Sequence, residues 1–195
     1  MNKAIHWLSL VIIGLTLCVG SLVAEDKEVK PIQPALLVID IQNQFLSGMA
    51  EKDMVLQYIN GLIWMFRENG FPIIRVYHTD PQWGPKPDSK EFQFPESINI
   101  KDDDPKIVKN YPSAFKKTEL DQILQDLNCN TLFLCGLNAT ACVLATYHTA
   151  QDLDYNVFIV RDAIMSPNAR HTDFVEEVFN TVPWEVVQVI LESAK

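Results

Sequence analysis

Short apolar runs alternate with amphipathic segments along most of the chain. An unbroken apolar run of strand length is typical of a strand that is covered on both faces. Such runs occupy residues 35–39 and 132–135. Two further buried strands are expected at residues 72–77, where Arg75 interrupts the apolar run, and at residues 156–160, which begin with Asn156. Further candidate strands lie at residues 106–109 and near residues 186–190.

Between these runs, apolar residues recur at the spacing of amphipathic helices. The expected helices cover residues 54–69, 120–127, about 141–153 and about 172–180. Asp53, Thr118 and Thr140 each precede or open one of these segments, and we expect them to act as N-caps. Strands that alternate with helices predict an α/β fold with a mostly parallel sheet.

Residues 1–24 do not follow this pattern. Lys3 precedes an apolar run over residues 8–19, and Ala24 stands before a charged segment. This arrangement resembles a cleavable signal peptide and predicts export to the periplasm or the medium, with no membrane association after cleavage. An uncleaved anchor is the alternative, although the run is short for a membrane span. Residues 25–33 are a polar linker, and residues 34–195 form the expected domain.

Composition narrows the class of partner. The 195-residue chain has a formal net charge of -9 and no cluster of Lys and Arg. An acidic surface argues against binding to nucleic acid or to anionic membranes, which leaves small molecules as the expected partners. Loss of Cys18 with the signal would leave Cys129, Cys135 and Cys142, an odd number that does not suit a disulfide scaffold.

Three reactive side chains follow predicted strands: Asp40, Lys109 and Cys142. The carboxyl ends of parallel strands share one edge of a sheet, so we expect these groups to meet there. A nearby ammonium and a helix N-terminus would favour a Cys142 thiolate, and a carboxylate can carry the proton. A small buried cysteine that packs helix on sheet is the simpler interpretation of Cys142 taken alone.

The residues around these three groups are more specific. Four segments resemble, in order, the motifs of the isochorismatase-like cysteine hydrolases. They are Leu-Val-Ile-Asp-Ile-Gln-Asn-Gln-Phe at 37–45, Lys-Asn-Tyr-Pro-Ser-Ala-Phe from 109, Gly-Leu-Asn-Ala-Thr-Ala-Cys-Val at 136–143, and Val-Arg-Asp-Ala at 160–163. The resemblance extends over nearly all of residues 34–190.

This resemblance implies a three-layer α/β/α domain with a six-stranded parallel sheet. It implies that Cys142 is the nucleophile, Asp40 the general base and acid, and Lys109 their electrostatic partner. It also implies a cis peptide between Leu137 and Asn138 that directs backbone N–H groups toward an oxyanion. A nucleophilic cysteine implies acyl transfer through a thioester, most often the hydrolysis of a small amide or carbamoyl compound.

The substrate pocket is less well defined by the sequence. Its candidates are Gln42, Phe45, His78, Trp83 and Phe115. Trp83 belongs to the proline-rich segment 81–104, which suits a binding loop as well as a plain surface excursion. Related nicotinamidases bind metal through an Asp-x-His pair and a further His. Here the order is His78-x-Asp80 without a second His nearby, so we expect neither a metal nor another cofactor.

Two other classes of function remain open at this point. The chain could be a ligand-binding relative without catalysis, or a redox protein in which Cys135 resolves a disulfide with Cys142. The intact Asp40, Lys109 and Cys142 set argues for the enzyme. The apolar character of residues 141–150, together with the family resemblance, also predicts a homo-oligomer.

Overall fold

The computed structural model describes residues 31–195. The expected signal peptide at residues 1–24, and the linker as far as residue 30, therefore lie outside the described residues. Within residues 31–195, no helix is both long enough and apolar enough to cross a membrane.

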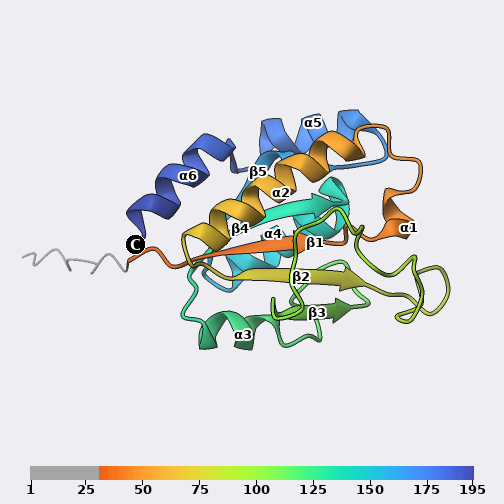
Figure 1. Cartoon of the computed structure of the whole chain (residues 1–195), viewed down its shortest axis with the longest axis horizontal. Coiled ribbons are helices and arrows are strands. Elements are labelled where there is room, and N and C mark those ends of the chain that lie inside the picture. The colour runs from red at the N-terminus through yellow and green to blue at the C-terminus, as the bar shows by residue number, and fades with distance from the viewer. Residues whose placement is uncertain (1–30) are drawn as a thin grey trace, which may run out of the picture. The chain divides into compact units, whose positions relative to one another are not determined.

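A six-stranded sheet forms the middle layer, in the order β3-β2-β1-β4-β5-β6 (Figure 1). Every neighbouring pair of strands is parallel. The strands are β1 (Pro34–Ile39), β2 (Ile73–His78), β3 (Lys106–Lys109), β4 (Thr131–Leu137), β5 (Asn156–Met165) and β6 (Thr181–Val182). All residues of β1 and β4 are buried, which explains their unbroken apolar sequence.

Helices cover both faces of this sheet. They are α1 (Asn43–Leu46), α2 (Lys52–Glu68), α3 (Leu120–Asp126), the π-helical turn η1 (Ala139–Val143), α4 (Leu144–Asp152), α5 (Ala169–Val178) and α6 (Trp184–Ser193). Leu36 and Val38 of β1 pack in one core with α2 and α6, whereas Leu37 and Ile39 face a second core with α3 and α4. The alternation along β1 thus separates two cores, and the expected three-layer α/β/α fold is confirmed.

The expected strand near residues 186–190 is wrong, because this segment lies in α6. Val187 and Leu191 are fully buried four residues apart, while Val186 and Val189 are exposed. That is the period of a helix with one buried face, which the β-branched run concealed. The last strand, β6, is a two-residue element that precedes this helix.

Two of the expected helix caps are also wrong. Asp53 lies inside the first turn of α2, and the N-cap residue Glu51 makes no side-chain cap. In α3 the N-cap position is taken by Glu119, although Thr118 Oγ1 still accepts a hydrogen bond from the Leu120 N–H at 3.3 Å. Both helices depend on their buried faces more than on capping.

Gly136 allows β4 to run two residues beyond its expected end. It has a φ of 111°, and a Cβ at this position would collide with the Ile39 carbonyl of β1. Only glycine combines this conformation with such a close approach. The strand therefore continues to Leu137 and delivers Asn138 to the carboxyl edge of the sheet.

Candidate active site

The carboxyl edge of the sheet brings the expected reactive groups together. Asp40 directly follows β1, Lys109 ends β3, and Cys142 lies in η1 just after β4. Lys109 is also in register with His78, the last residue of β2. In Figure 1 the strands point the same way, and α1 lies beyond their carboxyl ends. Parallel strands of matched register thus place four side chains at one edge.

Asp40 and Lys109 form a buried ion pair. Lys109 Nζ lies 2.6 Å from Asp40 Oδ2 and 3.2 Å from His78 Nδ1. Asp40 is 2% exposed and Lys109 1%. Burial raises the pKa of the Asp40 carboxyl above its usual value, while the ammonium of Lys109 opposes that rise. The other carboxylate oxygen, Oδ1, has no hydrogen-bond partner among the described residues.

Asp40 reaches this position through an unusual backbone conformation. Its φ is 55°, in the left-handed region that aspartate tolerates better than most residues. The Asp40 N–H still donates to the Val76 carbonyl at 2.9 Å, so the turn away from the sheet begins only after the last hydrogen bond of β1. The side chain then lies across the end of β2, toward Lys109.

Cys142 is held by a π-helical turn rather than by the first turn of an α-helix. The expected cap Thr140 is wrong, because Asn138 is the N-cap and its Oδ1 accepts from the Thr140 N–H at 3.3 Å. The same oxygen accepts from Ser166 Oγ at 2.7 Å. The peptide bond between Leu137 and Asn138 is cis. Asn138 therefore fixes the start of the turn that carries the sulfur.

The expectation of a ready-made thiolate is wrong for the free protein. Burial, together with the charge of Asp40, raises the pKa of Cys142 to about 12, although Lys109 opposes the shift. Cys142 is therefore a neutral thiol at ordinary pH. Candidate ligand atoms of Asp40, His78 and Cys142 all lie within 4.8 Å of one another, so a base stands beside the thiol proton.

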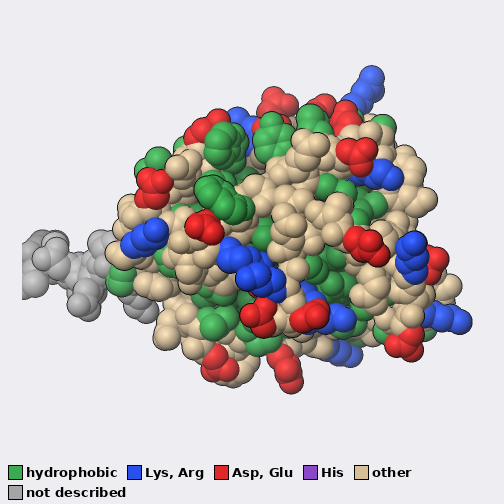
Figure 2. Space-filling model, in the orientation of Figure 1, with side chains coloured by type: hydrophobic (Ala, Val, Ile, Leu, Met, Phe, Trp, Pro, Cys, Tyr) green, Lys and Arg blue, Asp and Glu red, His purple; other side chains and the backbone are tan. Residues whose placement is uncertain are grey.

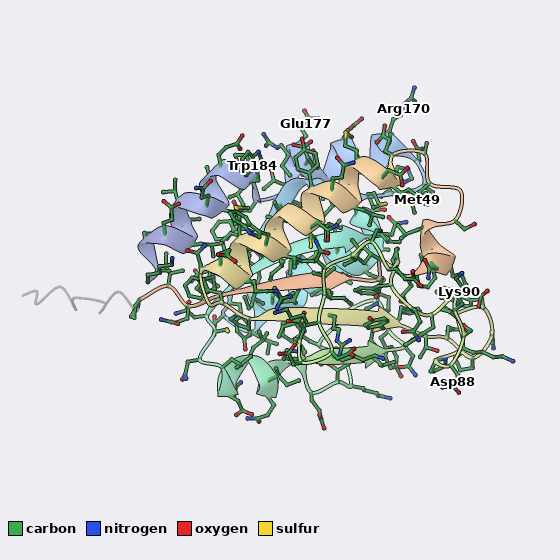
Figure 3. The ribbon with its side chains drawn as sticks, in the orientation of Figure 1. Met49, Asp88, Lys90, Arg170, Glu177 and Trp184 are labelled. Carbon is green, nitrogen blue, oxygen red and sulfur yellow. The ribbon has the colours of Figure 1, made fainter. Side chains whose placement is uncertain are left out.

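A cavity of about 270 Å³ opens over these groups. Its reactive lining residues are Asp40, His78 and Cys142. The rest of the lining is Phe45, Met49, Trp83, Leu137, Asn138, Ala141 and Pro167. Figure 3 shows Met49 between α1 and α2, beyond the carboxyl ends of the strands. Apart from the Asp40 carboxylate, which is paired with Lys109, this lining carries no charged side chain.

Of the five expected pocket residues, Phe45, His78 and Trp83 line this cavity. Gln42 does not line it: its side chain is buried and hydrogen-bonded to the backbone of His78. Phe115 does not line it either, because it packs in the core beside Tyr155 with ring centroids 5.9 Å apart. The sequence motifs do not show in which direction the side chains of Gln42 and Phe115 point.

Sequence reasoning missed Met49, Ala141 and Pro167 as lining residues. Pro167 follows β5, which is longer than its apolar run suggests. The polar pair at residues 161–162 ended the expected strand, but β5 continues to Met165 with a positive φ at Asp162. If this irregularity in β5 is recognised, the residues that follow the strand, including Pro167, become candidates for the cavity lining.

The proline-rich segment 81–104 is partly binding loop and partly core. Trp83 stacks on His78 with ring centroids 5.1 Å apart, and its carbonyl accepts from Gln44 Nε2 at 2.9 Å. Phe92 and Phe94 are buried instead and stack on Tyr77. Packing of these two rings anchors the segment, which lets Trp83 reach the cavity.

The cluster of Asp40, His78 and Cys142 carries donor atoms that a metal ion could use. The Lys109 ammonium already supplies a positive charge at this cluster, since it contacts both Asp40 Oδ2 and His78 Nδ1. A divalent cation would stand against that buried positive charge. The donor set therefore does not suit a metal beside Lys109.

A larger groove of about 390 Å³ lies between α2 and α6. Trp64 and Trp184 line it, and Figure 2 shows the apolar side chains gathered over these helices. Its lining has no acid, base or thiol of the kind that catalysis needs. We therefore assign the active site to the smaller cavity, because its lining carries the reactive side chains that the larger groove lacks.

The three cysteines of the described residues, Cys129, Cys135 and Cys142, are free thiols. Cys135 is fully buried in β4, and burial raises its pKa strongly. Such a thiol cannot readily reach or attack a partner, which removes the support for a redox pair with Cys142.

Comparison with known proteins gives a consistent result. The isochorismatase domain family matches residues 34–187. An uncharacterised isochorismatase family protein of Bacillus subtilis, YddQ, is 30% identical over 136 residues, which are 66% of this chain and 76% of that protein. A streptothricin hydrolase of Streptomyces noursei is 27% identical over 139 residues, covering 69% of this chain and 55% of its own.

Solved structures share the fold. The N-carbamoylsarcosine amidase of Thermoplasma acidophilum superposes with a TM-score of 0.69 at 27% identity, over 78% of this chain and 95% of that one. A putative isochorismatase hydrolase of Oleispira antarctica reaches a TM-score of 0.75 at 21% identity, over 82% of this chain and 98% of that one. The second likeness concerns the fold alone.

Proposed function

The chain belongs to the isochorismatase family of hydrolases, and from that premise we propose that it cleaves the C–N bond of a small amide or carbamoyl compound through Cys142. The amidase named among its structural neighbours supports this type of bond. The observation that carries the proposal is the buried ion pair of Asp40 and Lys109, with candidate ligand atoms of Asp40 and Cys142 within 4.8 Å of each other in the lining of one small cavity.

The first half-reaction forms a thioester. Cys142 Sγ attacks the substrate carbonyl carbon while its proton passes to Asp40, and the carbonyl electron pair moves onto oxygen. Asp40 then returns the proton to the leaving nitrogen as the C–N bond breaks and the carbonyl re-forms. Ammonia or an amine departs, and the acyl group stays on the sulfur. Burial raises the pKa of the Asp40 carboxyl, which makes it a better acceptor for the thiol proton, and the raised pKa of Cys142 keeps the thiol protonated until the attack.

The second half-reaction regenerates the enzyme. Water attacks the thioester carbonyl and gives one proton to Asp40, and the C–S bond then breaks as that proton returns to sulfur. Lys109 takes part in both halves by holding Asp40 Oδ2, so that the unpartnered Oδ1 is free for the moving proton. Its positive charge also stabilises the ionised carboxylate between transfers.

Backbone N–H groups at Asn138 and Cys142 are the proposed oxyanion donors. Leu137 and Asn138 both line the cavity, and the Asn138 side chain fixes this turn through Ser166 and Thr140. A charge on the carbonyl oxygen would otherwise develop in an apolar cavity, where it is costly.

Turnover of a panel of small amides and carbamoyl compounds tests the proposal, with ammonia release as the readout. The full chain should hydrolyse at least one compound, and Cys142→Ala should hydrolyse none. Mass spectrometry of a rapidly quenched reaction should find the acyl group on the peptide that contains Cys142. Ligands that bind without turnover by the wild-type chain would instead indicate a non-catalytic relative.

Export and self-association are further parts of the proposal. Export depends on residues 1–24, so N-terminal sequencing of protein from its native host should begin near Glu25. A cytosolic chain that still begins at Met1 would contradict it. Self-association is tested by sedimentation at micromolar concentration, where a single species with the mass of one chain would contradict a homo-oligomer.

A further inference from the structure

His78 occupies a rigid position at the end of β2. The residue is only 5% exposed. Its backbone N–H donates to Gln42 Oε1 at 2.7 Å, and its carbonyl accepts from Gln42 Nε2 at 2.9 Å. The imidazole stacks on Trp83 and meets the edge of Phe45 with ring centroids 6.0 Å apart. These contacts hold the ring in one orientation on the wall of the cavity.

Lys109 determines which nitrogen of this ring carries the proton. Lys109 Nζ lies 3.2 Å from His78 Nδ1, and an ammonium group can only donate. Nδ1 must therefore accept, and the proton of the neutral imidazole must be on Nε2. A charged imidazolium is disfavoured here: burial and the charge of Lys109 lower the pKa of His78 to about 4.

The Nε2 atom has no hydrogen-bond partner among the described residues, although it is buried. Asp40 Oδ1, the oxygen assigned above to proton transfer, is the other buried side-chain atom of residues 31–195 that has no hydrogen-bond partner. Buried donors are normally satisfied, so a functional site is the usual place for an exception. The cavity thus offers a free donor from His78 beside a free acceptor from Asp40.

We propose that the Nε2–H of His78 donates a hydrogen bond to an acceptor on the acyl portion of the substrate and so selects its class. The inference rests on the proposed function. The selected amides carry a hydrogen-bond acceptor near the scissile carbonyl, such as a ring nitrogen or a second carbonyl. Purely hydrocarbon acyl groups fit the apolar lining, but they leave the donor unpaired and are disfavoured.

Shape-matched amides separate this role from general apolar binding. Benzamide and the three pyridinecarboxamides have nearly equal size and differ in one ring atom, which is an acceptor in the pyridines. The wild-type chain should hydrolyse at least one pyridine isomer with a kcat/KM about tenfold or more above that of benzamide. Equal values for benzamide and all three isomers would overturn the inference.

Two variants divide the functions of the two ring nitrogens. His78→Asn keeps an acceptor near the Nδ1 position for Lys109 but removes the donor at Nε2. It should lose the preference for the acceptor-bearing amide over benzamide, mainly through KM, and this preference is the ratio of the two kcat/KM values rather than either rate alone. His78→Gln places an amide N–H near the Nε2 position and should restore part of the preference. Retention of the full preference by His78→Asn would contradict the proposal.

Two readouts do not require turnover. Nitrogen-15 NMR of the full chain with labelled histidine should show a neutral His78 with its proton on Nε2 between about pH 5 and 8, the signal being assigned by its loss in His78→Gln. A proton on Nδ1 would overturn the inference. If no amide is hydrolysed, the proposed function fails. Binding of the same four amides to Cys142→Ala then decides the role of His78, which is refuted if the acceptor-bearing amides show no advantage.

Discussion

Lys109 Nζ lies 2.6 Å from Asp40 Oδ2, and this contact joins the edge strand β3 to the central strand β1 across the end of β2. Both side chains are almost completely buried. Asp40, the expected proton carrier, therefore also contributes to the stability of the fold through this pair, because no water reaches either charge to replace its partner.

Removal of one partner should be costly. Lys109→Met leaves the Asp40 carboxylate buried without its cation, and we expect the free energy of unfolding to fall by about 3–5 kcal/mol at neutral pH. Urea denaturation measures the change. The loss should become smaller as the pH falls, since a protonated Asp40 carries no charge to compensate.

The double variant Asp40→Asn, Lys109→Met is the matched control for this prediction. It removes both charges, and we expect it to be more stable than Lys109→Met although it is equally inactive. A double variant as unstable as the sum of its two single variants would show that the ion pair contributes no coupling energy.

Alkylation of Cys142 should follow its raised pKa. Between about pH 7 and 9, the rate should rise about tenfold per pH unit without a plateau, because the thiolate remains the minor form. Asp40→Asn should react faster than wild type at each pH, since it removes the charge that opposes the thiolate and leaves Lys109 in place. A wild-type rate that levels off near pH 8 would contradict the neutral thiol.

The pH dependence of stability should report on His78. Its pKa is lowered to about 4 in the folded protein, against 6.5 as its ordinary value. Between these values the unfolded chain binds a proton that folded His78 does not, so this group makes the folded protein less stable as the pH falls from about 6.5 to 4. Thermal or urea unfolding should therefore depend less on pH in His78→Gln than in wild type over this range. An unchanged dependence would mean that His78 titrates normally.

Gly136 and Gly61 form a matched pair of glycine substitutions. Gly136→Ala places a Cβ against the Ile39 carbonyl at a φ of 111°, and we expect a loss of more than about 2 kcal/mol in unfolding free energy together with lost activity. Gly61 lies in α2 with open space around its missing Cβ. Gly61→Ala should stabilise by about 0.5–1 kcal/mol. A harmless Gly136→Ala would show that β4 can move away from β1.

The sequence was most informative where burial and local pattern agree. β3 has the bounds expected from residues 106–109, and β1 differs from its expected bounds by one residue. The apolar run near residues 186–190 predicted a strand because its β-branched residues suit one. The segment instead forms part of a helix that buries only one face. Only the structure shows that Cys142 is partly buried beside the Asp40 carboxylate, and its raised pKa depends on both conditions. The direction of the Gln42 side chain likewise depends on contacts with distant residues.

β3 has consequences for the lifetime of activity. It is a four-residue edge strand with a single neighbour, and Lys106 and Val108 face outward from it. Edge elements with few buried contacts open first in native-state hydrogen exchange, well before the central strands. Detachment of β3 would withdraw Lys109 and expose Ile107, while the other residues of both cores remain packed. On gentle heating, the protein should therefore enter a folded but inactive form, and its activity should disappear below the temperature at which the molecule melts.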